Sequence, residues 1–163
     1  VGKEVRLVDY YENQGEGLSF YRDVLEEKKY RYGKHIAPHD IAVKELGTGK
    51  TRLETAQGLG IDFLVVPRTP SKMDAIQAAR NTLGQCWFDE ERCQEGIKKL
   101  EHYRKEWDNN RGVWKNTPRH DENSHAADAF MTLAQGYDMV SARKIVKPTQ
   151  VNSKRRWLAH VAG

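Results

Sequence analysis

Hydrophobic positions along this chain switch between the spacing of strands and the spacing of helices. Residues 5–11 alternate and are rich in β-forming side chains, which predicts a strand. Apolar residues then recur at helical spacing and predict an amphipathic helix over about 17–29: Leu18, Tyr21, Leu25 and Tyr30. A short strand is expected at 34–38. A helix is expected at 51–59, where Gly60 would end it as a C-cap residue.

The second half of the chain continues the same alternation. Residues 62–66 form a short apolar run that Pro67 stops, which is typical of a buried parallel strand. Helices are expected near 72–83 and 89–106. The segment 108–118 is rich in Asn, Gly and Pro and predicts a loop, and a final helix is expected at about 123–137. Strands that alternate with helices indicate an α/β protein with a mostly parallel sheet.

Composition narrows the class of protein. The chain has 163 residues, 38% hydrophobic and 31% charged, which suits one domain with a sizeable core. It has no apolar run near 18 residues and no signal-peptide pattern, so we expect neither a membrane span nor export. Cys86 and Cys93 form no CxxC or Cys/His pattern, which argues against structural zinc and favours a reducing cytoplasm.

The positive charge is concentrated at the C-terminal end. The formal net charge is +4, and the residues from Arg143 onward include no acid. The basic residues that follow Arg143 are Lys144, Lys147, Lys154, Arg155 and Arg156. We therefore treat 141–163 as a basic tail, suited either to phosphate or an acidic partner or to simple solvation.

A glycine-rich loop invites comparison with nucleotide-binding loops. Gly47-Thr48-Gly49-Lys50-Thr51 resembles the end of a Walker motif, but the position five residues before Gly49 is Lys44 rather than glycine. No good hydrophobic strand leads into it. We therefore expect a surface loop that caps the helix beginning near Thr51.

The most informative stretch is His120-Asp121-Glu122-Asn123-Ser124-His125-Ala126-Ala127-Asp128-Ala129. It gathers three acids and two histidines at the start of a helix whose next turns are apolar. His125 and Asp128 are three residues apart and therefore share one helix face. A carboxylate beside a buried helix start is costly unless a cation or hydrogen bonds hold it. We interpret the stretch as one half of a divalent-metal site.

Asp40 is the natural second ligand, because it follows a short strand and precedes a loop. Ligands in parallel α/β sheets gather at the carboxyl ends of strands, although an aspartate in a turn is the simpler interpretation of Asp40 alone. Oxygen ligands with water suit Mg²⁺ or Mn²⁺, and two such ions can cleave a phosphodiester. Asp121 is a candidate third acid or a helix cap. His125 would orient water or help to hold the second ion, or be structural.

Six short motifs follow one another between residues 5 and 137. They are Val8-Asp9-Tyr10-Tyr11-Glu12-Asn13, Pro38-His39-Asp40, Gly60-Ile61 before Val65-Val66-Pro67, Ile76-Gln77-Ala78-Ala79-Arg80, Leu100-Glu101-His102-Tyr103-Arg104 and Ser124-His125-Ala126-Ala127-Asp128-Ala129-Phe130. This ordered series resembles the nuclease domain of bacteriophage terminase large subunits. The order of the motifs is more specific than any one of them.

The resemblance implies an α/β fold of the ribonuclease H-like type, a mixed sheet flanked by helices, over residues 1–140. It implies a metal-dependent endonuclease that cuts concatemeric double-stranded DNA when packaging begins and ends. Two ions of Mg²⁺ or Mn²⁺ would be held by Asp40 and Asp128, with His125 beside them. The implied partners are DNA, the portal protein and the small terminase subunit, in the cytoplasm of a bacterial host.

One departure from the family lowers the expected activity. The family's first metal-binding acid lies on an opening strand, ahead of the segment that corresponds to residues 8–13. The chain begins at Val1, so we expect a sheet that lacks its first strand or strands and an incomplete metal site. Asp9 lies on the wrong strand to replace the missing acid, and we interpret it as an outward-facing strand residue.

Basic side chains outside the acid cluster would position DNA phosphates without reading bases. The candidates are Lys50, Arg52, Arg68, Arg80 and Lys115. Two other functions remain open at this point. One is a non-catalytic module that docks DNA or the portal protein through the basic tail. The other is a ribonuclease H-like resolvase that prefers branched DNA.

Overall fold

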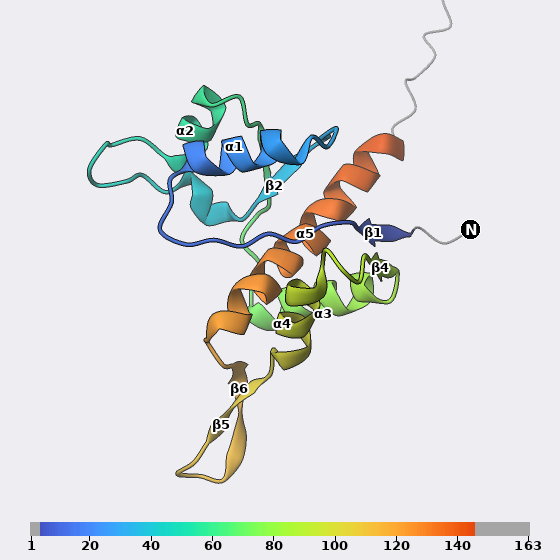
Figure 1. The fold of residues 1–163 in the computed structure, drawn as a ribbon. Coiled ribbons are helices and arrows are strands. Elements are labelled where there is room, and N and C mark those ends of the chain that lie inside the picture. Colours follow the sequence, from blue (N-terminus) through green and yellow to red (C-terminus); the bar gives the residue numbers. More distant parts are fainter. Residues whose placement is uncertain (1–3, 146–163) are drawn as a thin grey trace, which may run out of the picture.

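The computed structural model describes residues 4–145, which form a mixed α/β structure (Figure 1). Its elements in chain order are β1 (Val5–Leu7), α1 (Leu18–Lys28), β2 (His35–Ala37), the 3₁₀ helix η1 (His39–Ala42), α2 (Arg52–Gly58), β3 (Phe63–Val65), α3 (Lys72–Leu83), β4 (Cys86–Phe88), α4 (Gln94–His102), β5 (Lys105–Asp108), β6 (Val113–Pro118) and α5 (Glu122–Ile145). The basic tail beyond residue 145 lies outside the described residues.

The strands of residues 4–145 form three separate two-stranded sheets. β1 pairs with β4 in parallel, with Val5 opposite Cys86, and β2 pairs with β3 in parallel, with His35 opposite Phe63. β5 and β6 form an antiparallel hairpin. The alternation of strands and helices correctly predicted parallel pairing. The prediction of one mostly parallel sheet was wrong for these residues. Each parallel strand is only three residues long, so each pair depends on the helices that it contacts.

Helix α5 supports both parallel pairs and runs through the middle of the molecule (Figure 1). On one pair, the rings of Phe88 in β4 and Phe130 in α5 lie 6.3 Å apart. On the other pair, Ile36 of β2 packs against Gly136 so closely that a Cβ atom there would clash with it. Packing of this density transmits strain, so α5 fixes the position of each strand pair.

The buried core is formed where α3 and α4 pack against α5. Ala75, Ala127 and Met131 form its centre. Partly buried residues packed against that centre are Ile76, Ala79, Leu100 and Tyr103. Alanines on the facing sides of α3 and α5 bring the two helices close together, and this fixes the start of α3 beside α5.

Local signals predicted several elements well. Expected helices at 17–29, 51–59 and 72–83 correspond to α1, α2 and α3. Thr51 caps α2 in a reciprocal capping box with Glu54, as expected for the loop that resembles a nucleotide site. Gly60 follows the C-cap with a φ of +81°, which explains the glycine there.

Other boundaries differ from the expectation. The strand expected at 5–11 ends at Leu7, and the run at 62–66 is only half-buried as β3. The helix expected at 89–106 is shorter, because residues 90–93 form a turn before it and β5 begins at Lys105. The last helix extends to Ile145, so the boundary drawn at 140 falls inside α5.

The largest error concerns 108–118, which forms a hairpin turn and strand rather than a loop. Asp108 accepts hydrogen bonds from the backbone N–H groups of Asn110 and Arg111, at 3.0 and 3.1 Å. Gly112 donates its N–H to the Asp108 carbonyl and has a φ of +62°. The polar and glycine residues thus close a tight turn between β5 and β6.

Of the helices within residues 4–145, none is both long and apolar enough to cross a membrane.

Candidate metal and phosphate cleft

A cleft of about 1040 Å³ has both of the principal predicted acids in its lining. It is bounded by the end of β2 and η1, the segment after β3, the start of α3 and one side of α5. Asp40 and Asp128 both line it. Since the two residues are distant in sequence, the cleft is a product of the tertiary fold. Their common location agrees with the expectation for an acid at a strand end and one on a helix.

Asp40 lies in η1, directly after the carboxyl end of β2. The backbone carbonyl of Asp40 accepts the N–H of Val43 at 3.1 Å. Its neighbour Ile41 is buried and anchors the turn, whereas Asp40 itself is exposed. Its carboxylate is therefore on the solvent side of an anchored backbone and is available to a cation.

Asp128 is held in an ion pair with Lys72. Its side chain is 46% exposed, and Lys72 Nζ donates to its Oδ1 atom. Lys72 is the first residue of α3 and directly follows Ser71, which forms a capping box with Asp74. The lysine is therefore delivered to the cleft by a defined helix start. Its ammonium group compensates the carboxylate in this structure, as any bound cation would.

Asp9 is a third carboxylate in the lining of the cleft, although we expected it to be an outward-facing strand residue. It lies beyond the end of β1 rather than on the strand, and its side chain is only 19% exposed. Lys28 Nζ pairs with it at 2.5 Å. Burial acts to raise the pKa of Asp9, but the hydrogen bond and charge of Lys28 outweigh it, so the pKa lies below its ordinary value. The place of Asp9 in the cleft could have been predicted only if the strand had been expected to end at Leu7.

Several cations line the same cleft as the acids. Lys34, Arg68 and Lys72 contribute positive charge, and His35 and His39 contribute imidazoles. Lys34 is 3.3 Å from Asp62. Arg68 lies in the segment that leads from β3 to α3 and is exposed. Carboxylates and basic groups on one surface suit a ligand with both metal and phosphate chemistry.

Two of the predicted site residues lie outside the lining of this cleft. Asp121 accepts the N–H of Asn123 at 3.0 Å and pairs with Arg119 at 3.3 Å, so it caps α5. His125 is exposed, and its ring lies 6.0 Å from that of His120. The spacing of three residues predicted that His125 and Asp128 share one helix face. In the structure their surroundings differ, since Asp128 lines the cleft and His125 does not.

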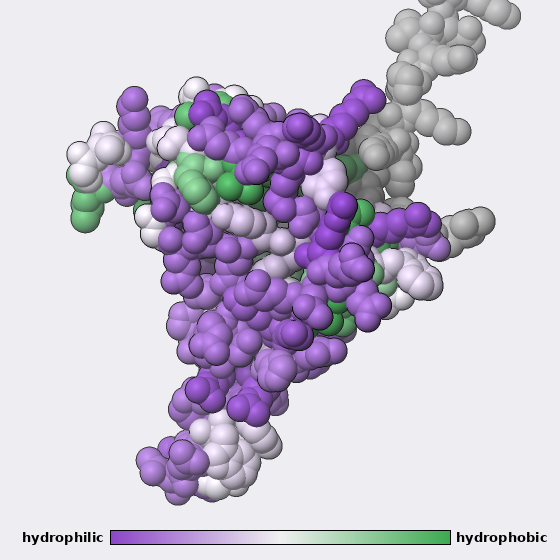
Figure 2. All heavy atoms as spheres, in the orientation of Figure 1, coloured by the Kyte–Doolittle hydropathy of each residue, from purple (hydrophilic) through white to green (hydrophobic). Residues whose placement is uncertain are grey.

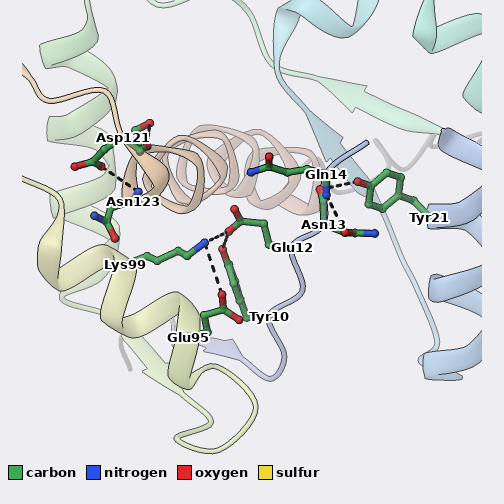
Figure 3. A network of polar contacts seen from close by, with 10 residues as sticks. Tyr10, Glu12, Asn13, Gln14, Tyr21, Glu95, Lys99, Asp121 and Asn123 are labelled. Atoms are coloured by element: carbon green, nitrogen blue, oxygen red, sulfur yellow. Dashed lines mark hydrogen bonds and ion pairs between the residues drawn. The ribbon is translucent and has the colours of Figure 1, made fainter. Parts of the chain in front are cut away.

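The charge of His125 acts on a second group of ionisable residues instead. Tyr10 donates its hydroxyl to Glu12, and Lys99 Nζ lies 2.7 Å from Glu12 and 3.7 Å from Glu95 (Figure 3). Burial acts to raise the pKa of Glu12, but hydrogen bonds from Lys99 and Tyr10 and the nearby His125 hold the pKa below its ordinary value. The network joins the N-terminal segment to α4 and lies beside α5.

The remaining predicted DNA contacts are dispersed over the surface. Lys50 lies in the loop before α2, and Arg52 pairs with Glu45 at 3.3 Å. Arg80 lines a separate cavity of about 240 Å³, beside Tyr103. The Tyr103 hydroxyl is buried without a hydrogen-bond partner among the described residues, and burial together with the charge of Asp128 raises its pKa to about 12.

The cleft offers carboxylate oxygens, which suit a hydrated divalent ion. Within residues 4–145, no three His, Cys, Asp or Glu side chains are close enough to form a metal-binding group. Mg²⁺ commonly uses one or two carboxylates and completes its coordination with water and phosphate oxygens. Asp40 and Asp128 supply that number of carboxylates on one cleft.

Comparison with known proteins adds no assignment: no family model, no curated protein and no solved structure matches this chain.

Proposed function

We propose that the chain is a metal-dependent DNA endonuclease domain with a ribonuclease H-like architecture, of the kind found in phage terminase large subunits. The observation that carries the proposal is the cleft lined by both Asp40 and Asp128. The ordered motifs described above are the second support. Asp9 adds a third carboxylate to the same surface, although Lys28 neutralises it in this structure.

Asp40 and Asp128 would hold Mg²⁺ or Mn²⁺, which supplies charge stabilisation of the oxygens in phosphodiester hydrolysis. Lys72 then has a second task. When a cation compensates Asp128, the Lys72 ammonium is free to contact a DNA phosphate, and Arg68 on the same cleft provides another contact. Because His125 is outside the cleft lining, we assign it to the Glu12 surroundings and not to the reacting centre.

The substrate in this proposal is concatemeric double-stranded DNA, cut as packaging begins and ends. The portal protein and the small terminase subunit would be partners, and the setting would be the cytoplasm of an infected bacterium. These assignments follow from the resemblance, and the cleft supports only the chemistry that they require.

The test is nicking of supercoiled plasmid by this chain in Mn²⁺ and in Mg²⁺. We expect relaxed circles that are absent in EDTA and absent for Asp40→Asn and Asp128→Asn. The matched control is Asp62→Asn, since Asp62 is an exposed acid outside the cleft lining, paired with Lys34. Cleavage by Asp40→Asn and Asp128→Asn at the rate of the unchanged chain would refute the proposal.

A non-catalytic DNA-docking module is the second candidate. It is favoured by the Lys72–Asp128 pair, which leaves that carboxylate compensated without metal. Deleting residues 146–163 separates the two functions. A docking module should lose DNA binding in EDTA, whereas a nuclease should retain nicking in Mn²⁺.

A further inference from the structure

The β5–β6 hairpin exposes two tryptophans near its tip. Trp107 is 44% exposed and Trp114 is 54% exposed, and they are cross-strand partners. Their ring centroids lie 5.0 Å apart with an interplanar angle of 72°. Tryptophan is usually largely buried, so two adjacent exposed indoles call for a partner. The hairpin that carries them projects from the helical body (Figure 1).

The hairpin and its base carry excess positive charge. The segment 104–119 has five basic residues and two acids, which gives five minus two, or +3. The basic residues are Arg104, Lys105, Arg111, Lys115 and Arg119. Both acids are already engaged, because Glu106 pairs with Lys115 at 2.7 Å and Asp108 accepts hydrogen bonds within the turn. Hydrophilic and paler surface lie side by side on this projection (Figure 2).

This combination favours an anionic partner that presents flat aromatic groups. An acidic protein surface would use the charge but has no general need for two exposed indoles. A nucleic acid uses both, because bases stack on aromatic rings whatever their sequence and phosphates contact lysine and arginine. Stacking requires bases that are not already covered by neighbours in a duplex, as at a nick, a frayed end or a single strand.

We propose that Trp107 and Trp114 form a stacking platform for unpaired DNA bases, with Arg104, Lys105 and Arg111 contacting the adjoining phosphates. The hairpin would hold a strand end or an opened region beside the body of the protein. This deepens the proposed nuclease function, since it names the form of DNA that the chain grips outside the cleft, and it rests on that function for its biological setting.

The test measures binding of the full chain to a labelled oligo-dT strand in EDTA, by fluorescence anisotropy. We expect Trp107→Ala and Trp114→Ala each to weaken binding by roughly five-fold or more, the lower end of a lost stacking interaction. Trp107→Phe and Trp114→Phe should retain most of the affinity, because phenylalanine still stacks. Trp87→Ala is the matched control, being 66% exposed but located on β4. A blunt duplex of equal length should respond less to the alanine variants.

A second measurement keeps both hairpin tryptophans, so it does not require that an alanine variant still folds. In a Trp87→Phe/Trp157→Phe chain, the hairpin tryptophans are the only tryptophans left, and saturating oligo-dT should quench the tryptophan emission. Unchanged affinity in both alanine variants, or unquenched hairpin fluorescence at saturation, would overturn the proposal. The proposal would also be overturned if the alanine variants lost affinity for an acidic polypeptide but kept their affinity for oligo-dT. Since no metal is present, failure of plasmid nicking would leave these results unaffected.

Discussion

Gly96 of α4 lies against the ring of Tyr10, so that a Cβ atom on Gly96 would be 2.7 Å from the Tyr10 Cδ2 atom. Tyr10 is also fixed through its hydroxyl, which donates to Glu12. The N-terminal segment after β1 is thus held against α4 by a contact that only glycine permits. The ring cannot rotate away without losing that hydrogen bond.

Gly96→Ala should destabilise the fold. Overpacking typically costs about 1–3 kcal/mol, and the better helix propensity of alanine returns up to about 1 kcal/mol. From the middle of the first range, we expect a net loss of about 1 kcal/mol in urea unfolding. Gly84→Ala is the control, because nothing lies within 4 Å of a Cβ atom there and its φ is −63°. Equal stability of the two variants would contradict the close contact.

The Glu12–Lys99 pair should make stability depend on acid pH. The folded-state pKa of Glu12 lies below its ordinary value of 4.5, so its contribution is present above that value and is lost as pH falls through the folded pKa. At pH 7, Glu12→Gln should cost about 2 kcal/mol, in the range for hydrogen bonds to charged groups. The difference between the two proteins should shrink steadily below pH 4.5.

Chemical denaturation at several pH values between 3 and 7 measures this difference, at roughly one-unit steps. Glu95→Gln is the control, because Glu95 is 72% exposed and lies 3.7 Å from Lys99. Exposed pairs contribute about 0.2–1 kcal/mol, so its effect should be small. A Glu12→Gln cost that stays constant across this pH range would rule out a charged Glu12 as the stabilising partner.

Lys72→Met should weaken DNA binding through the loss of one phosphate contact. The slope of log K against log salt should become shallower by about 0.9, the value for one released counterion on duplex DNA. Binding titrations in EDTA at several salt concentrations measure the slope, with both lysine variants made in an Asp128→Asn chain, where Lys72 is released from its ion pair without a metal ion. Lys98→Met is the control, since Lys98 is exposed on α4 and outside the cleft lining. Identical slopes for the two variants would exclude Lys72 from the phosphate-binding surface.

Thr51→Ala should destabilise α2 by removing its capping box. Thr51 accepts the N–H of Glu54 at 3.0 Å, and Glu54 accepts the N–H of Thr51 at 2.7 Å. The expected cost in thermal or urea unfolding is about 1 kcal/mol. Thr48→Ala in the same loop removes a weaker local contact at 3.3 Å and should stay within about 0.5 kcal/mol. A Thr51 effect no larger than the Thr48 effect would contradict the role of the cap.

Elements with local signals could be predicted from the sequence. The bounds of α3 match the expectation of 72–83, because Ser71 and Asp74 form a capping box that a stretch of four residues already specifies. The hairpin was missed because its ladder pairs Trp107 with Trp114 across a turn, and the strong turn signal at Asn109-Asn110-Arg111-Gly112 was taken for a loop.

The candidate site was only partly predictable for the same reason. Asp40 and Asp128 could be chosen because a strand end and a helix start each carry a recognisable signal. Asp9 could not, because its place in the cleft depends on where β1 ends and on the distant Lys28. His125 was assigned by helical spacing, but which neighbour it meets depends on how α4 and the N-terminal segment pack beside α5.

The junction between β2 and α5 has a consequence for how DNA could enter. Within residues 4–145, no backbone ladder joins the β1–β4 pair to the β2–β3 pair, and both are attached through α5. Partial separation of β2 from Gly136 would widen the cleft while the core of Ala75, Ala127 and Met131 stays intact. The two strand pairs would then move relative to each other about α5. Amide protons of β2 and β3 would exchange with solvent before those of α3.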